Sequence, residues 1–378
     1  MSSNLSPVYL DYNATAPIRP EAADAVARAL AIGANPSSVH TRGRAARSLV
    51  EQARSTVARL IGAESQALVF TSGGTEANAL AIESAVAAGF APFIIGATEH
   101  DAVIENARAA GGRFIPWPVD SSGVADLGWL REELARDGGD RPFVALMLAN
   151  NETGVIQPVA EAAELVQAAN GWLHVDAVQA AGKMTVGFTA LGADTLALSA
   201  HKLGGPQGAG ALVWGPRAIM ARRLHGGGQE RGRRAGTENL SGIAGFAAAV
   251  DACVEKPVDM AAARDAAAAR LKAVGTVVIG EGAPRLDNTL CIAVPDWTSE
   301  LQVIALDLDG VMVSAGAACS SGKVKPSRVL QAMGLDELAP GALRASGGWA
   351  TTADDWARFA DVWTAAYARH TARRASAA

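Results

Sequence analysis

The feature that most limits the possible folds is a regular alternation of short apolar runs with longer segments of helical periodicity. Runs such as residues 172–175 and 195–198 have the length of buried strands, and each is followed by polar or Gly-rich residues. Segments such as residues 21–30 and 44–61 carry apolar side chains at helical spacing. Strands that alternate with helices form a mostly parallel sheet with helices on both faces. The sequence therefore predicts an α/β fold.

Other apolar runs of the same kind complete this sheet. Five further strands are expected at residues 67–71, 93–96, 113–116, 143–148 and 211–214. Helical segments such as residues 159–169 lie between many of them. With the two runs named above, these strands predict a mostly parallel, seven-stranded sheet flanked by helices.

The pattern changes near residues 255–258, where the alternation gives way to an Ala-rich helix and shorter strands. The elements expected there are a helix at 260–274, strands at 276–279, 290–294 and 311–314, and a C-terminal amphipathic helix at 354–373. A chain of 378 residues is long enough for one large domain and one smaller one. We expect a large domain at residues 15–254 and a smaller α+β domain formed by residues 1–14 and 255–378.

The composition excludes several classes of function. A formal net charge of −5 lacks the basic surplus of a nucleic-acid-binding protein. The three cysteines are far apart and form no CxxC pair, so we expect no disulfide framework and no metal site. The first residues lack the basic and apolar regions of a signal peptide, and no run reaches the ~20 apolar residues of a membrane span. We therefore expect a cytoplasmic protein without a membrane partner.

The first motif with chemical content is the sequence TSGGTE at residues 71–76, between an expected strand and an expected helix. Its glycines, including Gly74, let the backbone approach an anion closely. The helix start offers free N–H groups, and Thr75 adds a hydroxyl. The motif lacks the G-x-x-x-x-G-K-[ST] form of an ATP-binding loop. It predicts a phosphate site, with an ordinary strand–helix turn as the alternative.

Two further motifs follow the ends of neighbouring expected strands, where ligands of open α/β sheets bind. A buried Asp176 could keep a pyridinium nitrogen protonated, and its alternative role is to cap a helix. A lysine beside a phosphate site, such as Lys202, could react with an aldehyde, and Ser199 and His201 could reach the phosphate. A solvated loop carrying a surface lysine would not require the S-x-H-K-x-G-G-P sequence found here.

The fourth motif places Cys319 among small residues, in the sequence SAGAACSSG at residues 314–322. Small neighbours are typical of an accessible loop in which a thiolate can react. Cys253 and Cys291 lie in apolar sequence and are interpreted as unreactive core residues. Burial of Cys319 as a small apolar side chain is the alternative, and it agrees less well with the polar residues that follow.

Further motifs occur in order along the chain, at residues 9–15, 35–40, 98–103, 150–154, 225–232 and 234–239. With the four motifs above they cover nearly the whole sequence and resemble the cysteine desulfurases. These enzymes form part of the class V (fold-type I) superfamily of pyridoxal 5'-phosphate (PLP) enzymes. The stretch around Cys319, which ends at residues 325–327, is similar to the NifS/IscS-like group with an extended catalytic loop, which serves iron–sulfur and nitrogenase assembly.

The resemblance implies a role for each candidate site residue. Lys202 would hold PLP covalently, Asp176 would pair with the ring nitrogen, and His100 would stack on the ring and assist proton transfer. Arg344 would bind the substrate carboxylate through its two-pronged guanidinium. The remaining implied contacts are Asn151 and Gln179 at the phenolic oxygen, Gly74, Thr75, Ser199 and His201 at the phosphate, Thr237 at the phosphate from the partner subunit, and Asn35 and Asn151 at the substrate.

The implied reaction converts L-cysteine to L-alanine and leaves the sulfur on Cys319 as a persulfide. Lys202 would take the α-proton of the substrate, and the Cys319 thiolate would then attack the substrate sulfur. The protein would thus be a transferase and a homodimer. A sulfur-acceptor protein, such as a scaffold or carrier for iron–sulfur clusters, would receive the sulfur.

The chain departs from the family's usual pattern in places. Members commonly continue from the carboxylate-binding arginine as Arg-Phe-Ser-Leu-Gly-Arg, whereas here the last position of that stretch is Trp349. Lys325 stands where an acidic residue is usual. The chain also ends soon after its last expected helix, without the longer tail by which some members meet a scaffold. The sulfur acceptor is therefore left open.

Two other functions compete with the desulfurase hypothesis. The first is another enzyme of the superfamily, either an aminotransferase or a lyase acting on selenocysteine; Cys319 argues against transamination, which needs no cysteine. The second is a catalytically weak homologue that serves as an assembly or regulatory subunit. The intact Lys202, Asp176 and Arg344 argue against it, and Trp349 is the one hint in its favour.

Overall fold

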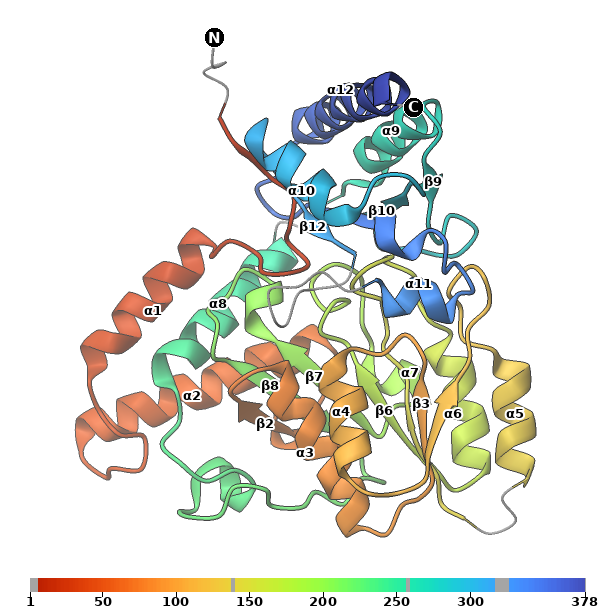
Figure 1. Cartoon of the computed structure of the whole chain (residues 1–378). Coiled ribbons are helices and arrows are strands. Elements are labelled where there is room, and N and C mark those ends of the chain that lie inside the picture. The colour runs from red at the N-terminus through yellow and green to blue at the C-terminus, as the bar shows by residue number, and fades with distance from the viewer. Residues whose placement is uncertain (1–5, 137–139, 256–258, 317–325, 378) are drawn as a thin grey trace.

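The structure of the protein is a computed structural model that describes residues 6–136, 140–255, 259–316 and 326–377. Figure 1 shows a large sheet flanked by helices, with a smaller group of strands and helices above it. The strands are β1 Val8–Tyr9, β2 Leu68–Thr71, β3 Phe93–Gly96, β4 Phe114–Trp117, β5 Phe143–Ala145, β6 Trp172–Asp176, β7 Thr195–Ser199, β8 Gly210–Trp214, β9 Val277–Val278, β10 Thr289–Ala293, β11 Val311–Met312, β12 Ser314–Ala315 and β13 Leu343–Ser346.

The helices follow the alternation expected from the sequence. They are α1 Pro20–Ile32, α2 Thr41–Leu60, α3 Gly74–Ala87, α4 Asp101–Ala109, α5 Leu127–Arg136, α6 Val159–Ala168, α7 Phe188–Leu191, α8 Leu240–Glu255, α9 Ala261–Lys272, α10 Ser299–Leu308, α11 Arg328–Ala332 and α12 Ala353–Ala377. Short 3-10 turns occur at Ser65–Ala67, Ala200–Lys202, Gln229–Gly232 and Ala339–Gly341. None of the described helices combines the length with the apolar character that crossing a bilayer requires.

The large sheet has seven strands in the order β2-β8-β7-β6-β5-β3-β4. Strand β8 is antiparallel to both of its neighbours, and the other pairs are parallel. Side chains of β6 and β7 are buried on both faces of the sheet, as expected for strands covered by helices. The mostly parallel, seven-stranded sheet predicted from the sequence is thereby confirmed.

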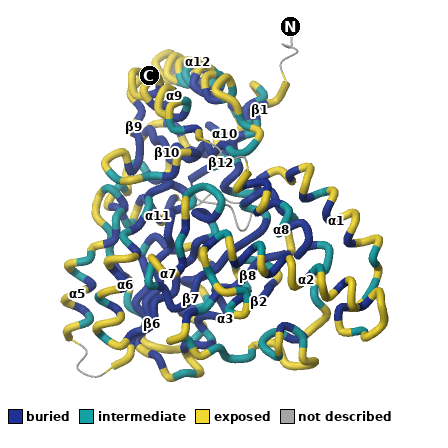
Figure 2. The backbone as a smooth tube through the Cα atoms, turned by 180° about the vertical axis from the view of Figure 1, so that it is seen from behind, coloured by how far each residue is buried: buried dark blue, intermediate teal, exposed yellow. Residues whose placement is uncertain are grey.

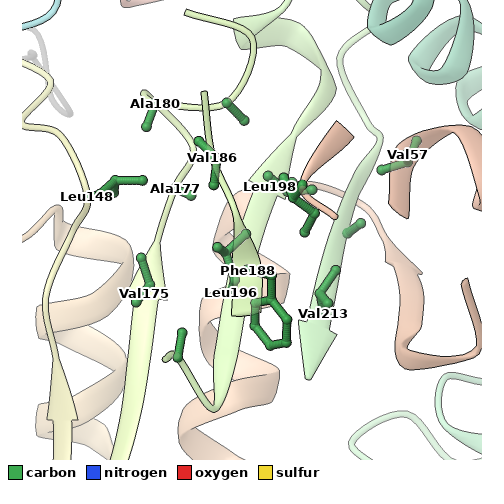
Figure 3. Close-up of a cluster of buried hydrophobic side chains, with 14 of the residues drawn as sticks. Val57, Leu148, Val175, Ala177, Ala180, Val186, Phe188, Leu196, Leu198 and Val213 are labelled. Carbon is green, nitrogen blue, oxygen red and sulfur yellow. The ribbon is translucent and has the colours of Figure 1, made fainter. Parts of the chain in front are cut away.

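The main core lies on one face of this sheet. Figure 3 shows Val175, Leu196, Leu198 and Val213 from three neighbouring strands packed against Phe188 of α7. In Figure 2 strands β6 and β7 are buried along their length, while α1, α2 and α5 each show an exposed side. Burial of this apolar surface is the main source of stability, at about 25 cal/mol per Å².

The smaller group is built on a four-stranded sheet in the order β12-β13-β10-β9. The N-terminal strand β1 pairs in parallel with β11, so the first described residues join the C-terminal part of the chain in this region. Its core includes Trp297, Trp356 and Trp363 together with side chains of β10 and β13. The two sheets thus have separate apolar cores. The division of the chain into residues 15–254, 1–14 and 255–378 remains a prediction.

The structure corrects two details of the expected strands. The run at 311–314 is divided, because β11 pairs with β1 whereas β12 pairs with β13. Strand β13 was not expected as a strand, since the charged Arg344 at its second position hides the apolar pattern. That arginine is buried, with 1% of its surface exposed, and its place in the sheet carries it to the functional site.

Candidate active site

A cleft opens where the carboxyl ends of β5, β6 and β7 meet the beginning of α3. It encloses about 650 Å³ of space, part of which is open to solvent. The described residues that line it are Gly74, Thr75, Asn78, His100, Ala102, Met147, Ala149, Asn151, Asp176, Val178, Gln179, Ser199, His201 and Lys202. Nine of the thirteen predicted site residues are therefore brought together in one place: Gly74, Thr75, His100, Asn151, Asp176, Gln179, Ser199, His201 and Lys202.

One end of the cleft is suited to an anion. The first turn of α3 begins at Gly74, and its N–H groups have no partners within the helix. A Cβ at Gly74 would lie 2.8 Å from Cγ2 of Val178, so only glycine lets these two segments approach so closely. Thr75 is exposed on this turn, and Ser199 lies at the end of β7. Free N–H groups, the helix dipole and two hydroxyls together favour a bound phosphate.

Asp176 ends β6 at the opposite side of this anion site and is 7% exposed. Its Oδ2 accepts a hydrogen bond from Asn78 Nδ2 at 2.8 Å, and its Oδ1 accepts one from the Val178 amide at 2.9 Å. No helix begins at the residues that follow, so Asp176 is not a helix cap. A carboxylate oriented by two N–H donors at the wall of a cleft is suited to bind a cationic ring nitrogen.

The amine of Lys202 lies between two backbone carbonyl groups. Its Nζ donates to the Asn13 carbonyl at 2.6 Å and to the Ala14 carbonyl at 2.9 Å. Burial, with a further contribution from the positive charge of Arg344, lowers the pKa of Lys202 to about 8. About a tenth of the amine is therefore neutral at pH 7, and this neutral form is the one that attacks an aldehyde.

His201, next to Lys202, is fixed by Thr15, whose hydroxyl lies 3.1 Å from His201 Nδ1. Burial, followed by the charge of Lys202, lowers the pKa of His201 to about 4. The imidazole is therefore neutral at physiological pH. On the far wall, His100 precedes α4, and its Nδ1 accepts a hydrogen bond from the Ala102 amide at 3.0 Å. In neutral His100 the proton is thus on Nε2.

Gln179 is oriented by groups that the sequence did not single out. Its Oε1 accepts from Lys183 Nζ at 2.6 Å, and its Nε2 donates to the Asn13 carbonyl at 2.9 Å. Lys183 also donates to Asn13 Oδ1 at 2.8 Å, and burial lowers the pKa of Lys183 well below its ordinary value. A lysine–glutamine pair four residues apart after a strand is the sequence signal that could have indicated this contact.

Arg344 lies beside the cleft and does not line it. Its Nη2 forms an ion pair with Asp11 Oδ1 at 2.6 Å, and its Nη1 donates to the Asn151 carbonyl at 3.2 Å. Its Nε is buried and has no hydrogen-bond partner among the described residues. An unsatisfied guanidinium N–H is costly to bury, and a substrate carboxylate would satisfy it.

A buried carboxyl group connects the cleft to the smaller sheet. Glu152, two residues beyond the Asn150 turn, accepts a hydrogen bond from Ser327 Oγ at 2.6 Å. Ser327 in turn caps α11 by accepting from the Leu330 amide. Burial raises the pKa of Glu152 to about 7, so the contact changes protonation near neutral pH.

Trp349 has a packing role here. Its Nε1 donates to the Pro17 carbonyl at 2.9 Å, and the Arg19 guanidinium carbon lies 5.6 Å from its ring centre. Gly348 beside it has no Cβ to overlap the ring of Tyr12. Trp349 closes a small cavity on the far side of Lys202, where a second arginine stands in the family pattern.

Three predicted residues are not placed in the cleft, and a fourth lies outside the described residues. Arg344 lies behind Asn151. Thr237 is exposed and lines a separate depression with Ser72. Asn35 lies between α1 and α2, and its side chain accepts from the Ser37 amide. Cys319 is the one outside the described residues, so its predicted role stays a prediction. Thr237 and Asn35 stay predictions as well.

The other two cysteines are buried, as expected. Cys291 lies within β10 and Cys253 within α8, and burial raises the pKa of both thiols. Neither is paired in a disulfide. Among the described residues there is also no group of three His, Cys, Asp or Glu side chains that could hold a metal ion.

The chemistry of the cleft fits PLP. The cradle that a Cβ at Gly74 would fill suits a phosphate, Asp176 suits a protonated ring nitrogen, and Lys202 suits an aldehyde carbon. Gln179, through its donor Nε2, and Asn151 both line the cleft and are candidates for the phenolic oxygen. The side chains present thus supply a partner for each polar group of the cofactor.

Comparison with known proteins gives consistent results. The family model for aminotransferase class-V matches residues 8–359. The chain is 40% identical over 376 residues to the cysteine desulfurase of Cereibacter sphaeroides, with 94% of each chain covered. It is 37% identical to the cysteine desulfurase IscS of Dictyoglomus turgidum, covering 92% of this chain and 91% of that one. A solved NifS-like protein from Rickettsia africae superimposes with a TM-score of 0.86 at 30% identity, covering 96% of this chain and 99% of that one.

Proposed function

We propose, from the premise that this chain belongs to the aminotransferase class-V family, that it is a PLP-dependent cysteine desulfurase. The observation that carries this function is the convergence of Lys202, Asp176 and the anion cradle of α3 in one cleft, with Arg344 directly behind it. Relatives that bear the name cysteine desulfurase share 34–40% of their residues with most of this chain.

The cofactor, when bound, supplies an electron sink that makes the α-proton of an amino acid acidic. The chain's own residues hold it and position the substrate. The residues that would hold the cofactor are Lys202, Asp176, Ser199 and the first turn of α3, and the second N–H of Gln179 Nε2 would be a donor to it.

Arg344 selects an amino acid by binding its carboxylate, which takes up the unsatisfied Nε. Lys202 then accepts the α-proton, because its lowered pKa leaves part of the amine neutral at physiological pH. His100 assists in moving a proton through Nε2, since Nδ1 is occupied by the Ala102 amide.

The sulfur leaves through Cys319. Its thiolate attacks the sulfur of L-cysteine, an S–S bond forms, and the C–S bond of the substrate breaks. The electron pair of that bond remains on the substrate carbon, which takes up a proton to give L-alanine. Cys319 is left as a persulfide, and the sulfur passes to an acceptor protein, for example in iron–sulfur cluster assembly.

The active enzyme is a cytoplasmic homodimer. Thr237 is exposed in this chain and lies next to the surface around Ser72, close to the start of α3. In a dimer this exposed segment can complete the phosphate site of the second subunit. Light scattering should therefore give twice the mass of the chain, and Thr237→Ala should weaken PLP binding without separating the subunits. A monomer with full PLP affinity would contradict this arrangement.

The decisive experiment is the mass of the Cys319 peptide after PLP-loaded protein has reacted with L-cysteine without reductant. A gain of one sulfur, matched by released alanine and absent in Cys319→Ala, is expected. If the cofactor spectrum responds to L-cysteine but no sulfur is gained and pyruvate-type products form instead, the enzyme is an aminotransferase. If the spectrum does not respond at all, the assembly-subunit hypothesis is favoured.

A further inference from the structure

The buried polar residues that continue inward from Asp176 are not used by the proposed reaction. Strand β6 has the sequence WLHVD, so Trp172, His174 and Asp176 point to the same face of the sheet. Leu173 and Val175 point to the opposite face and pack in the main core. A fully buried histidine costs free energy unless both ring nitrogens are hydrogen-bonded, and an apolar residue would have served the fold equally well.

Both nitrogens of His174 have partners. Its Nδ1 lies 3.0 Å from Thr195 Oγ1 on the neighbouring strand, and its Nε2 lies 2.9 Å from Asn78 Oδ1 on α3. Thr195 Oγ1 also accepts from Trp172 Nε1 at 2.9 Å. With the bond from Asn78 Nδ2 to Asp176, these contacts form an unbroken chain from Trp172 to the carboxylate. Each member of the chain is less than 9% exposed.

The direction of every bond in this chain is fixed by chemistry at both ends. The indole N–H of Trp172 can only donate, so Thr195 Oγ1 accepts that hydrogen bond. The hydroxyl of Thr195 is then free to donate its own proton in a hydrogen bond to His174 Nδ1. The carboxylate of Asp176 can only accept, so the amide nitrogen of Asn78 faces it and the amide oxygen faces His174. His174 must therefore carry its proton on Nε2. Burial lowers the pKa of His174 to about 3, so the ring stays neutral and keeps this tautomer.

We propose that Trp172, Thr195, His174 and Asn78 form a one-directional hydrogen-bond relay that positions the Asp176 carboxylate for the ring nitrogen of the cofactor. In this relay His174 is a positioning residue. It lies outside the cleft lining, whereas Asn78 and Asp176 are part of it, so His174 reaches the ligand only through Asn78. The four donor groups all point toward Asp176, and hydrogen bonds in such a row strengthen one another.

The relay explains why the amide of Asn78 cannot rotate. If it turned over, its oxygen would face the Asp176 carboxylate and its NH₂ group would face the protonated Nε2 of His174, so both contacts would become repulsive. Phe143 stacks on the His174 ring with the centroids 6.1 Å apart and keeps the ring in place. The orientation of the cofactor-binding carboxylate is thereby set from the interior of the sheet.

The test compares two variants of one residue. His174→Gln keeps a neutral side chain that can donate to Asn78 and accept from Thr195, whereas His174→Leu removes both bonds at similar volume. Gln157→Leu is the matched control, because Gln157 is also buried, bonds Ala125 and Gly123, and lies outside the cleft lining. Each purified apoprotein is titrated with PLP, and the dissociation constant and the visible absorption band of the bound cofactor are measured.

The relay predicts that His174→Leu raises the PLP dissociation constant about tenfold and shifts the absorption band. His174→Gln should stay within about twofold of the parent protein, and so should Gln157→Leu. Equal behaviour of the Leu and Gln variants would overturn the relay. If His174→Leu does not fold, Thr195→Val, which preserves shape, is expected to weaken PLP about threefold, and unchanged affinity would overturn the relay too.

The inference rests on the proposed function only for its PLP site. The readouts use PLP alone, without L-cysteine, so they do not depend on sulfur transfer. A protein that binds PLP through the relay but forms no persulfide would leave the relay intact and contradict the desulfurase. If the parent protein forms persulfide normally but the two His174 variants behave alike, the desulfurase function is supported and the relay is contradicted.

Discussion

The two charged residues that the proposed reaction uses to hold its ligands, Asp176 and Arg344, are supported in different ways. Asp176 is held by two neutral donors, one from α3 and one from the turn that follows β6, and His174 behind Asn78 stays neutral because burial lowers its pKa to about 3. Arg344 is held by an ion pair to Asp11, which is 333 residues away in the chain.

The difference follows from the task of each residue. A cofactor partner has a fixed ligand, so a rigid and permanently neutral support is advantageous. A substrate arginine must exchange partners in every cycle, and an ion pair with a carboxylate that is 21% exposed can give way to another carboxylate. In the cofactor half of the site, Asp176 is thus supported by the segment after its own strand and by the helix that covers the sheet, whereas in the substrate half Arg344 is supported by a residue from near the opposite end of the chain.

The largest expected effect comes from the cofactor half. Asp176→Asn keeps the size of the side chain but removes the negative charge that favours a protonated ring nitrogen. Turnover of L-cysteine should fall by about 10³-fold, as measured by released alanine. The KM for L-cysteine should change little, because Arg344 is untouched. A loss confined to KM would show that the two halves are not separate.

The second prediction concerns the contact between Glu152 and Ser327, which lies outside both halves. Burial raises the pKa of Glu152 to about 7, whereas the ordinary value in an unfolded chain is 4.5. Between these pH values the folded protein retains a proton that the unfolded chain has lost, so the free energy of unfolding falls as pH rises from 4.5 to about 7. The full loss is about 3 kcal/mol, and it levels off above pH 7.

Glu152→Gln removes this titration while preserving the hydrogen bond to Ser327. Urea unfolding of both proteins between pH 5 and 8 should show a decline of stability with pH that is steeper in the parent than in the variant, because the variant lacks the contribution of Glu152. If the two plots of unfolding free energy against pH run parallel, the titration of Glu152 does not contribute to the stability of the fold.

The third prediction concerns the substrate half. Arg344→Lys keeps the positive charge but loses the two-pronged geometry and the Nε group. The KM for L-cysteine should rise by about 30-fold with a smaller change in kcat, because the lost contact is made by the bound substrate and the transition state alike. PLP affinity should be unchanged. If PLP affinity fell while the KM for L-cysteine stayed unaltered, Arg344 would belong to the cofactor half of the site.

The smallest expected effect is that of Trp349→Phe. The variant keeps the aromatic ring over Arg19 but loses the hydrogen bond to the Pro17 carbonyl. Unfolding free energy should fall by about 1 kcal/mol, and both kcat and KM should remain near those of the parent. A marked change in KM would mean that Trp349 contributes to substrate binding.

Much of the fold was predictable because strands of a covered sheet are short apolar runs that stand out in the sequence. Strands β3, β6 and β7 were expected within one residue of their observed bounds. Strands β1 and β13 were missed, since one has two residues and the other contains a buried arginine. Such strands are stabilised by partners far away in the chain, and no local pattern reports them.

The sequence by itself determined the alternation of strands and helices, the motifs at the strand ends and the chemistry of Asp176 and Lys202. These depend on residue type and on local spacing, which sequence displays directly. Only the tertiary structure decided the supports of those residues: Asn78 and His174 behind Asp176, the carbonyl of Asn13 beside Lys202, and Asp11 against Arg344. Hydrogen bonds between distant segments require both partners within about 3 Å, and that proximity arises only when the chain has folded.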